Sequence, residues 1–178
     1  CGWDCVLDID SPYIEYSQIT SYLLVEALKL YGVKCFGLKF SGRKGFHIII
    51  PFEAFPKEVG RKPIETMFPE GPRMIADFLG EKIYSKLSEM ILKDQKIEEI
   101  CKLTKKPMEE LTDSQGNFNP FSVVDIDTIL ISSRHLFRSV YSINEKSWLV
   151  SIPIDPEKLN EFKLRDAKIQ NVKTDVPF

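Results

Sequence analysis

WDCVLDID, residues Trp3–Asp10, has the alternating pattern of a half-buried β-strand. The period of two places Leu7 and Ile9 on one face and Asp8 and Asp10 on the other, and successive side chains of one face lie about 7 Å apart. Ser-Pro follows and ends the strand. Carboxylate oxygens suit divalent cations, and two cations roughly 3.5–4 Å apart could be held if a third carboxylate joined from elsewhere. The alternative is that the two aspartates only cap the strand and begin a turn.

The composition is that of an ordinary globular protein. The 178 residues are 43% hydrophobic and 28% charged, enough for one domain with a proper core. No apolar run is long enough to span a bilayer, so we expect no membrane association. The four cysteines lack zinc spacing, which favours reduced thiols and a cytoplasmic location. A net charge of -2 excludes a wholly basic surface, while 24 Lys and Arg leave room for a local basic site.

Helical and strand periodicities alternate along the chain. Helices are predicted from Ser17, as N-cap, to about Tyr31 and from Arg73 to Lys93. Strands over 33–40 and 46–50 form a hairpin. Shorter elements are a helix over 95–104, a strand over 121–126, a short helical turn that Ser132-Ser133 could cap, a hairpin over 141–152 and a helix that begins at Asp155-Pro156. We therefore expect an α+β fold with a mixed or antiparallel sheet and flanking helices.

The loop of the first hairpin, Ser-Gly-Arg-Lys-Gly (residues 41–45), has the composition of a phosphate-binding loop. Glycine lets backbone N–H groups approach an anion, serine offers a hydrogen bond, and the Arg and Lys supply charge. The spacing and the strand that follows exclude a P-loop. His47 could donate to a phosphate oxygen. The alternatives are a solvated hairpin tip and a structural histidine.

Three features now follow one another: a D-x-D strand, an S-G-x-x-G-x-H hairpin about thirty residues later, and a further aspartate followed by a basic turn. The ordered set resembles the archaeo-eukaryotic primase superfamily, which includes primase small subunits, primase–polymerases and the polymerase domains of bacterial end-joining ligases. The matching motifs are Val6–Asp10, Phe40–His47 and Val124–Asp127 continuing through Arg138. The resemblance covers most of residues 3–153.

The resemblance implies an RRM-like sheet, the archaeo-eukaryotic primase catalytic core, and template-dependent nucleotidyl transfer with two Mg²⁺ or Mn²⁺ ions. The metal-binding and catalytic residues would be Asp8, Asp10 and Asp127. Asp127 is chosen over Asp125 because its distance to the following arginines resembles that of primase–polymerases; strand alternation places both aspartates on one face. The implied nucleotide contacts are Ser41, Arg43, Lys44, Gly45, His47, Arg134 and Arg138.

The implied partners are NTP or dNTP, a single-stranded DNA template and a primer, together with a larger primase subunit, a helicase or another fused domain. Relatives usually have an N-terminal region before D-x-D, so we expect residues 1–178 to be a catalytic core taken from a longer protein. The sequence leaves open NTP against dNTP and priming against extension. The alternatives are a gap-filling or end-joining polymerase of the same superfamily, a non-catalytic nucleotide- or nucleic-acid-binding module, and a two-metal nuclease or phosphatase.

Overall fold

The computed structural model describes residues 2–127 and 137–174. Its main elements are β1 (Cys5–Asp10), α1 (Ile14–Leu30), β2 (Gly37–Phe40), β3 (Phe46–Ile50), α2 (Glu70–Asp94) and β6 (Asp125–Asp127). The sheet order is β2-β3-β1-β6, and each neighbouring pair is antiparallel. This β-α-β-β-α-β order is that of ferredoxin-like folds, and β1 is an inner strand of the sheet, between β3 and β6. The α+β fold and the antiparallel sheet predicted from the sequence are confirmed.

The remaining elements are short and lie in the connections and the C-terminal segment. They are η1 (Phe52–Ala54), β4 (Glu58–Val59), β5 (Lys62–Pro63), η2 (Ile64–Met67), α3 (Ile97–Thr104), α4 (Met108–Leu111), η3 (Pro120–Ser122), η4 (Pro156–Glu161), η5 (Leu164–Ala167) and η6 (Ile169–Asn171). Among the helices in the described part of the chain, none combines the length and apolar character needed to cross a bilayer.

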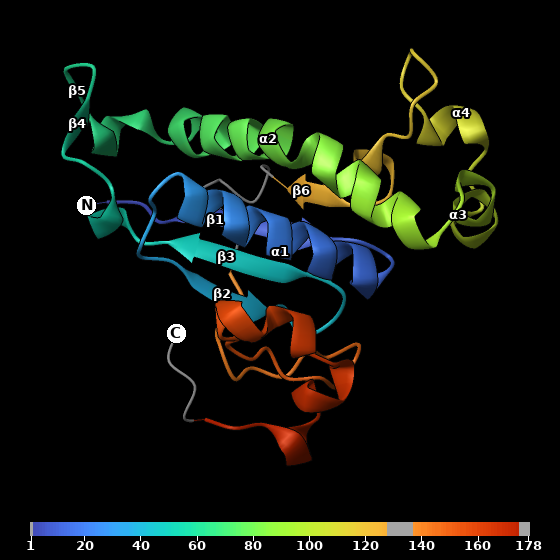
Figure 1. Ribbon diagram of the computed structural model, residues 1–178. Helices are drawn as coiled ribbons and strands as arrows, with labels where there is room; N and C mark the ends of the chain where they lie inside the picture. The colour runs from blue at the N-terminus through green and yellow to red at the C-terminus, as the bar shows by residue number, and fades with distance from the viewer. Residues whose placement is uncertain (1, 128–136, 175–178) are drawn as a thin grey trace.

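The hydrophobic core lies between one face of the sheet and the helices. Leu7 and Ile9 of β1 are fully buried, and they meet Leu24 of α1 and Ile83 of α2. Figure 1 shows α1 and α2 running side by side over the sheet. Because burial of each such side chain contributes about 2 kcal/mol, the alternation of β1 fixes which face turns to the helices.

The C-terminal segment extends the sheet beyond β2. The Phe40 N–H donates to the Ile152 carbonyl (2.9 Å), and the Ile154 N–H donates to the Leu38 carbonyl (2.8 Å). Phe162 packs its ring on Phe40 at a centroid distance of 5.0 Å. This pairing covers a strand edge that would otherwise expose unpaired backbone groups.

Several sequence predictions were wrong in their boundaries. The strand expected over 33–40 covers only Gly37–Phe40 (β2). Ser17 is not an N-cap: it lies inside α1, fully buried. The helix begins earlier because the Ser11 hydroxyl accepts the Tyr13 N–H (3.1 Å) and donates to the Val123 carbonyl (2.6 Å), which fixes the entry turn. The strand expected over 121–126 begins only at Asp125, because Asn119 caps a 3-10 turn with its side chain.

The predicted hairpin over 141–152 is confirmed as an antiparallel pairing without regular strands. Ile143 and Val150 form an isolated bridge, and the Ser151 N–H donates to the Ser142 carbonyl at 2.9 Å. The helical start at Asp155 is confirmed, since its carboxylate accepts the Glu157 N–H at 3.0 Å. The short helical turn expected after Ser132 lies outside the described residues.

Candidate active site

The sheet face turned away from the helices carries four carboxylates. In the antiparallel pair β1–β6, Asp8 lies opposite Asp127 and Asp10 lies opposite Asp125. Residues directly opposite each other share a face, with Cβ atoms about 5 Å apart. The fold therefore brings together the three predicted aspartates and adds Asp125. We call this the carboxylate face.

Repulsion and burial act together on these carboxylates. Burial raises the pKa of Asp10, and the charge of Asp8 raises it further. Burial likewise raises the pKa of Asp125, followed by the charges of Asp127 and Asp8. The fold thus holds like charges close together, an arrangement that a bound cation would relieve.

His47, in β3, lies opposite Asp8 of β1 and so continues the same row of side chains across the sheet. Its Nε2 lies 3.1 Å from Asp8 Oδ1, and its side chain is 9% exposed. The Phe137 ring lies 4.9 Å from the imidazole. His47 Nδ1 is buried without a hydrogen-bond partner among the described residues. The histidine therefore faces the carboxylates rather than the apolar core.

The basic hairpin loop (residues 41–45) lies directly against the end of β1. A Cβ on Gly45 would stand 2.4 Å from the Ile9 carbonyl oxygen and 3.2 Å from Asp10 Oδ1, so only glycine permits this approach. The Ser41 hydroxyl accepts the Gly45 N–H at 3.2 Å and closes the loop. Its two cations, Lys44 and Arg43, act on Asp10 by lowering its pKa, against the larger effect of burial.

Sequence reasoning missed Lys39 and Phe137. Lys39 is fully buried on the row of His47, and its Nζ donates to the Arg138 carbonyl and to Ser151 Oγ, the latter at 3.3 Å. The ammonium lies 4.1 Å from the Phe137 ring centroid. Burial lowers the pKa of Lys39 to about 8. Alternation along β2 could have placed Lys39 opposite to the core side chains, but its partners depend on the register.

Of the two predicted arginines, Arg138 lies among the described residues and Arg134 does not. The Arg138 guanidinium donates to the Ile143 carbonyl (3.1 Å) and to the Glu145 carboxylate (3.0 Å). Arg138 thus stands beside Lys39 but is engaged by an exposed acidic side chain.

A pocket of about 720 Å³ opens over the carboxylate face. The four carboxylates line it together with Thr104 and Lys106 among others. In residues 2–127 and 137–174, no three His, Cys, Asp or Glu side chains already form a set that could hold a metal ion. The donor types nevertheless fit one, since Mg²⁺ and Mn²⁺ prefer carboxylate oxygen and the strand register brings four carboxylates together on one face.

Comparison with known proteins places these observations in a family. The uncharacterized protein MJECS07 of Methanocaldococcus jannaschii is 38% identical over 82 residues, which are 46% of this chain and 18% of that protein. The solved polymerase domain of Ligase D from Mycobacterium tuberculosis, in complex with DNA, is similar over 98% of this chain and 56% of that domain, with a TM-score of 0.48 and 15% identity. The family model of the DNA primase small subunit matches residues 7–156. The chain therefore belongs to the DNA primase small subunit family.

Proposed function

We propose that the chain is the catalytic core of a template-dependent nucleotidyl transferase, a DNA primase or primase–polymerase. Family membership supports nucleotidyl transfer at the general level. The observation that carries the finer proposal is the carboxylate face beside the basic hairpin loop, since a nucleoside triphosphate needs anion contacts next to a metal site.

Asp8, Asp10 and Asp127 would hold two divalent cations, Mg²⁺ or Mn²⁺, with Asp125 as the alternative third ligand. Such a cation pair lowers the pKa of an attacking 3′-hydroxyl and offsets the charge on the leaving pyrophosphate. The chain's own contribution is to hold these carboxylates on one rigid sheet face. Nucleotidyl transfer requires little covalent chemistry from the protein, so positioning and charge carry the catalysis.

The nucleotide would lie across the basic hairpin loop. Ser41, Gly45 and the cations Arg43 and Lys44 would contact its triphosphate, and His47 would donate to a phosphate oxygen while Asp8 orients its ring. Arg138 would exchange Glu145 for phosphate. Arg134 stays a prediction from the resemblance.

The test is an incorporation assay with template, nucleotides and Mg²⁺ or Mn²⁺, in primed and unprimed reactions. The double variant Asp8→Ala, Asp10→Ala should lose incorporation by at least 10³-fold and stay folded. Asp94→Ala, an exposed carboxylate at the end of α2, is the matched control and should keep the wild-type rate.

The outcomes separate the alternatives. Product only in the primed reaction would assign extension or gap filling rather than priming. Nucleotide binding without any incorporation would assign a binding module, and release of nucleotides from labelled DNA would assign a nuclease. The DNA template, the partner subunit or fused domain and the cytoplasmic location remain predictions of the same proposal.

A further inference from the structure

We propose that a surface beside the basic hairpin loop binds a single-stranded nucleic acid, with the indole of Trp148 as a stacking platform for one base. The surface consists of Trp148 and Ile169, which adjoin the bridge between Leu149 and Lys168, together with the exposed Lys168, Arg165 and Lys163 of the turn η5 and its flanks, which the Val150 N–H joins through the Ala167 carbonyl (2.8 Å). We call it the Trp148 surface. The inference rests on the proposed function, because the bound strand would be the template of that nucleotidyl transfer.

Trp148 is presented to solvent by a backbone that opposes this placement. Trp148 is 71% exposed, and its φ of 59° lies in the left-handed region that a bulky residue rarely adopts. The surrounding turn enforces it: the Trp148 N–H donates to the Asn144 carbonyl (2.9 Å), and the Asn144 side chain accepts the Lys146 N–H (3.0 Å). Residues that the surrounding structure holds in a strained backbone conformation cluster at functional sites.

The turn is also fixed to the basic hairpin loop. The Ser147 hydroxyl donates to the Gly42 carbonyl at 2.5 Å. A Cβ on Gly42 would stand 3.2 Å from Asn144 Cβ, so the two turns pack in direct contact. A base stacked on Trp148 would therefore be tied to the loop that carries Arg43.

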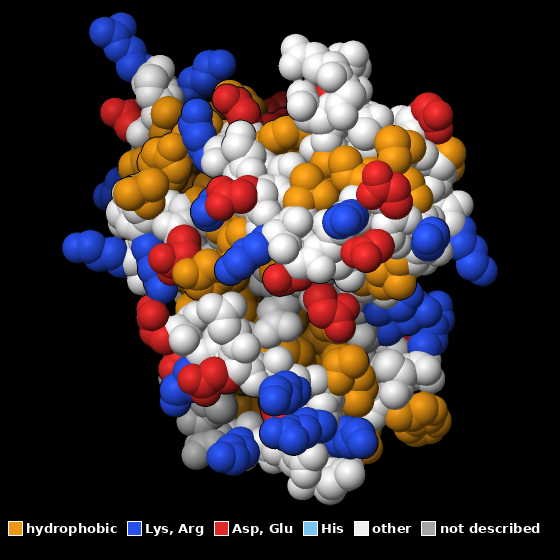
Figure 2. All heavy atoms as spheres, turned by 45° about the vertical axis from the view of Figure 1, so that its right-hand side comes forward, with side chains coloured by type: hydrophobic (Ala, Val, Ile, Leu, Met, Phe, Trp, Pro, Cys, Tyr) orange, Lys and Arg blue, Asp and Glu red, His pale blue; other side chains and the backbone are white. Residues whose placement is uncertain are grey.

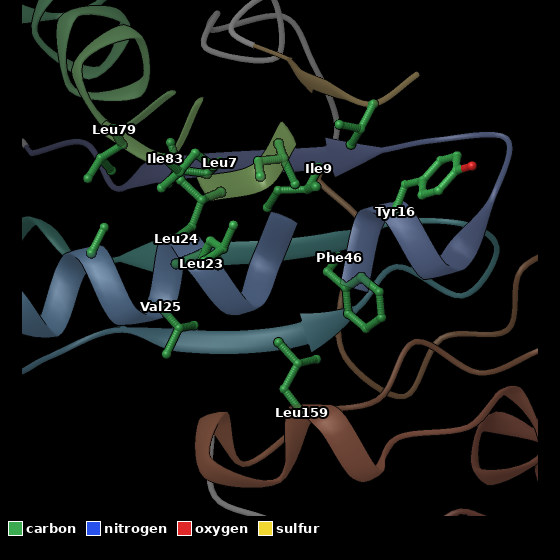
Figure 3. Packing of buried hydrophobic residues seen from close by; sticks show 14 of the residues in the cluster. Leu7, Ile9, Tyr16, Leu23, Leu24, Val25, Phe46, Leu79, Ile83 and Leu159 are labelled. Carbon is green, nitrogen blue, oxygen red and sulfur yellow. The ribbon is translucent and has the colours of Figure 1, made fainter. Parts of the chain in front are cut away.

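The neighbouring chain supplies positive charge. Leu149 bridges Lys168, and the residues adjoining this bridge, Trp148 and Ile169, are both exposed. Residues 158–174 contain five Lys and Arg against two Asp and Glu, although the whole chain has a net charge of -2. In the lower part of Figure 2, at the height of the C-terminal segment in Figure 1, Lys and Arg side chains gather beside apolar ones.

This combination fits a polyanion with exposed bases better than a protein partner. An aromatic ring among exposed Lys and Arg side chains is typical of sites that track a phosphate backbone and stack its bases. Stacking does not depend on which base is present, as template binding requires.

Trp148 can report on its own contact. Only Trp3 and Trp148 occur in the chain, and Trp3 is partly buried with its indole N–H on the Ile64 carbonyl (3.1 Å). In a Trp3→Phe background, oligo-dT is added at low salt without nucleotide or divalent cation. We expect quenching of Trp148 emission, and in anisotropy with labelled oligo-dT an affinity about 10-fold lower for Trp148→Ala.

The charged residues have a separate signature. Arg165→Ala and Lys168→Ala should each reduce the salt slope of binding by about 0.7, the value for one phosphate contact on a single strand. Trp148→Phe should retain most of the affinity. Leu30→Ala, 82% exposed at the end of α1, and Lys93→Ala, exposed on α2, are the matched controls and should bind as the wild type does.

Failure of this inference and of the proposed function can be told apart. Nucleotide incorporation without quenching, or unchanged oligo-dT affinity in Trp148→Ala, overturns the Trp148 surface and leaves the proposed function standing. Quenching without incorporation sinks the proposed function and leaves the surface standing. The variant Asp8→Ala, Asp10→Ala should keep the quenching while it loses turnover.

Discussion

Lys39 connects the sheet to the segment that covers it. Its ammonium holds the Arg138 carbonyl and lies under the Phe137 ring, and that ring also packs on His47. A buried ammonium is tolerated only with such partners. We therefore regard Lys39 as a positioning residue that seats residues 137–138 beside the imidazole.

The lowered pKa of Lys39 gives a test with a defined sign. Because its folded-state pKa of about 8 lies below the ordinary 10.5, the native state loses this proton before the unfolded state does. The free energy of unfolding should thus gain a rising contribution between about pH 8 and pH 10.5. Chemical denaturation of Lys39→Met should lack this contribution. Lys93→Met, on the exposed side of α2, should keep it; equal slopes in both variants would exclude the role.

The sequence predicted single residues where a local pattern sufficed. Asp8, Asp10 and the glycine-bracketed loop follow from alternation and composition. Lys39 was missed because its partners Arg138 and Ser151 lie about a hundred residues away, and only the register brings them together. Alternation could not choose between Asp125 and Asp127, because it places both on one face, and the register brings both to the carboxylate face.

Among the elements, the basic hairpin loop depends on one glycine for its contact with the following turn. Gly42 has a φ of 94°, and a Cβ there would press on Asn144 Cβ at 3.2 Å and on the Leu149 carbonyl at 3.4 Å. Gly42→Ala should cost about 1 kcal/mol for the left-handed backbone and a further amount for the contact. It should also weaken nucleotide binding, because the loop moves.

Gly32→Ala provides the matched comparison. Gly32 has a φ of 80° but no atom within 4 Å of an added Cβ. It should show only the backbone cost, measured by urea denaturation, and unchanged nucleotide affinity by fluorescence titration. If the two variants lose equal stability and bind nucleotide equally, the packing of the loop against the turn contributes neither to stability nor to nucleotide binding.

Element existence was easier to predict than element boundaries. The helix over Glu70–Asp94 and the strands of the hairpin follow from strong periodicity. The start of α1 could not be read from Ser17, because the true entry turn uses a hydrogen bond from Ser11 to Val123, over a hundred residues away. Tertiary contacts of this kind override a local capping signal.

At the scale of the molecule, the strand order was the least predictable feature. Local patterns supply the strands, but the central place of β1 between β3 and β6 depends on pairings that join residues 5–10 to residues 125–127. The family resemblance, rather than periodicity, predicted that the last aspartates meet the first. The carboxylate face is the product of this long-range pairing.

The carboxylate face also sets how the stability of the whole chain depends on pH and cations. Asp10 and Asp125 have folded-state pKa values raised above the ordinary 3.8, so without cation the native state loses stability as the pH rises above 3.8 and these carboxyls ionise. Asp125→Asn should therefore raise the cation-free melting temperature at pH 7.

Mg²⁺ or Mn²⁺ at 100 times its Kd should stabilise the wild type by about 2.7 kcal/mol at pH 7 and less at pH 4.5, where protons compete. Asp113→Asn is the opposite control: hydrogen bonds from Asn117 and its neighbours lower the pKa of Asp113, so this variant should lose stability at pH 7 and keep the full response to cation. A cation response that is equal in Asp8→Ala and wild type would place the metal elsewhere and remove the chemical basis of the carboxylate face.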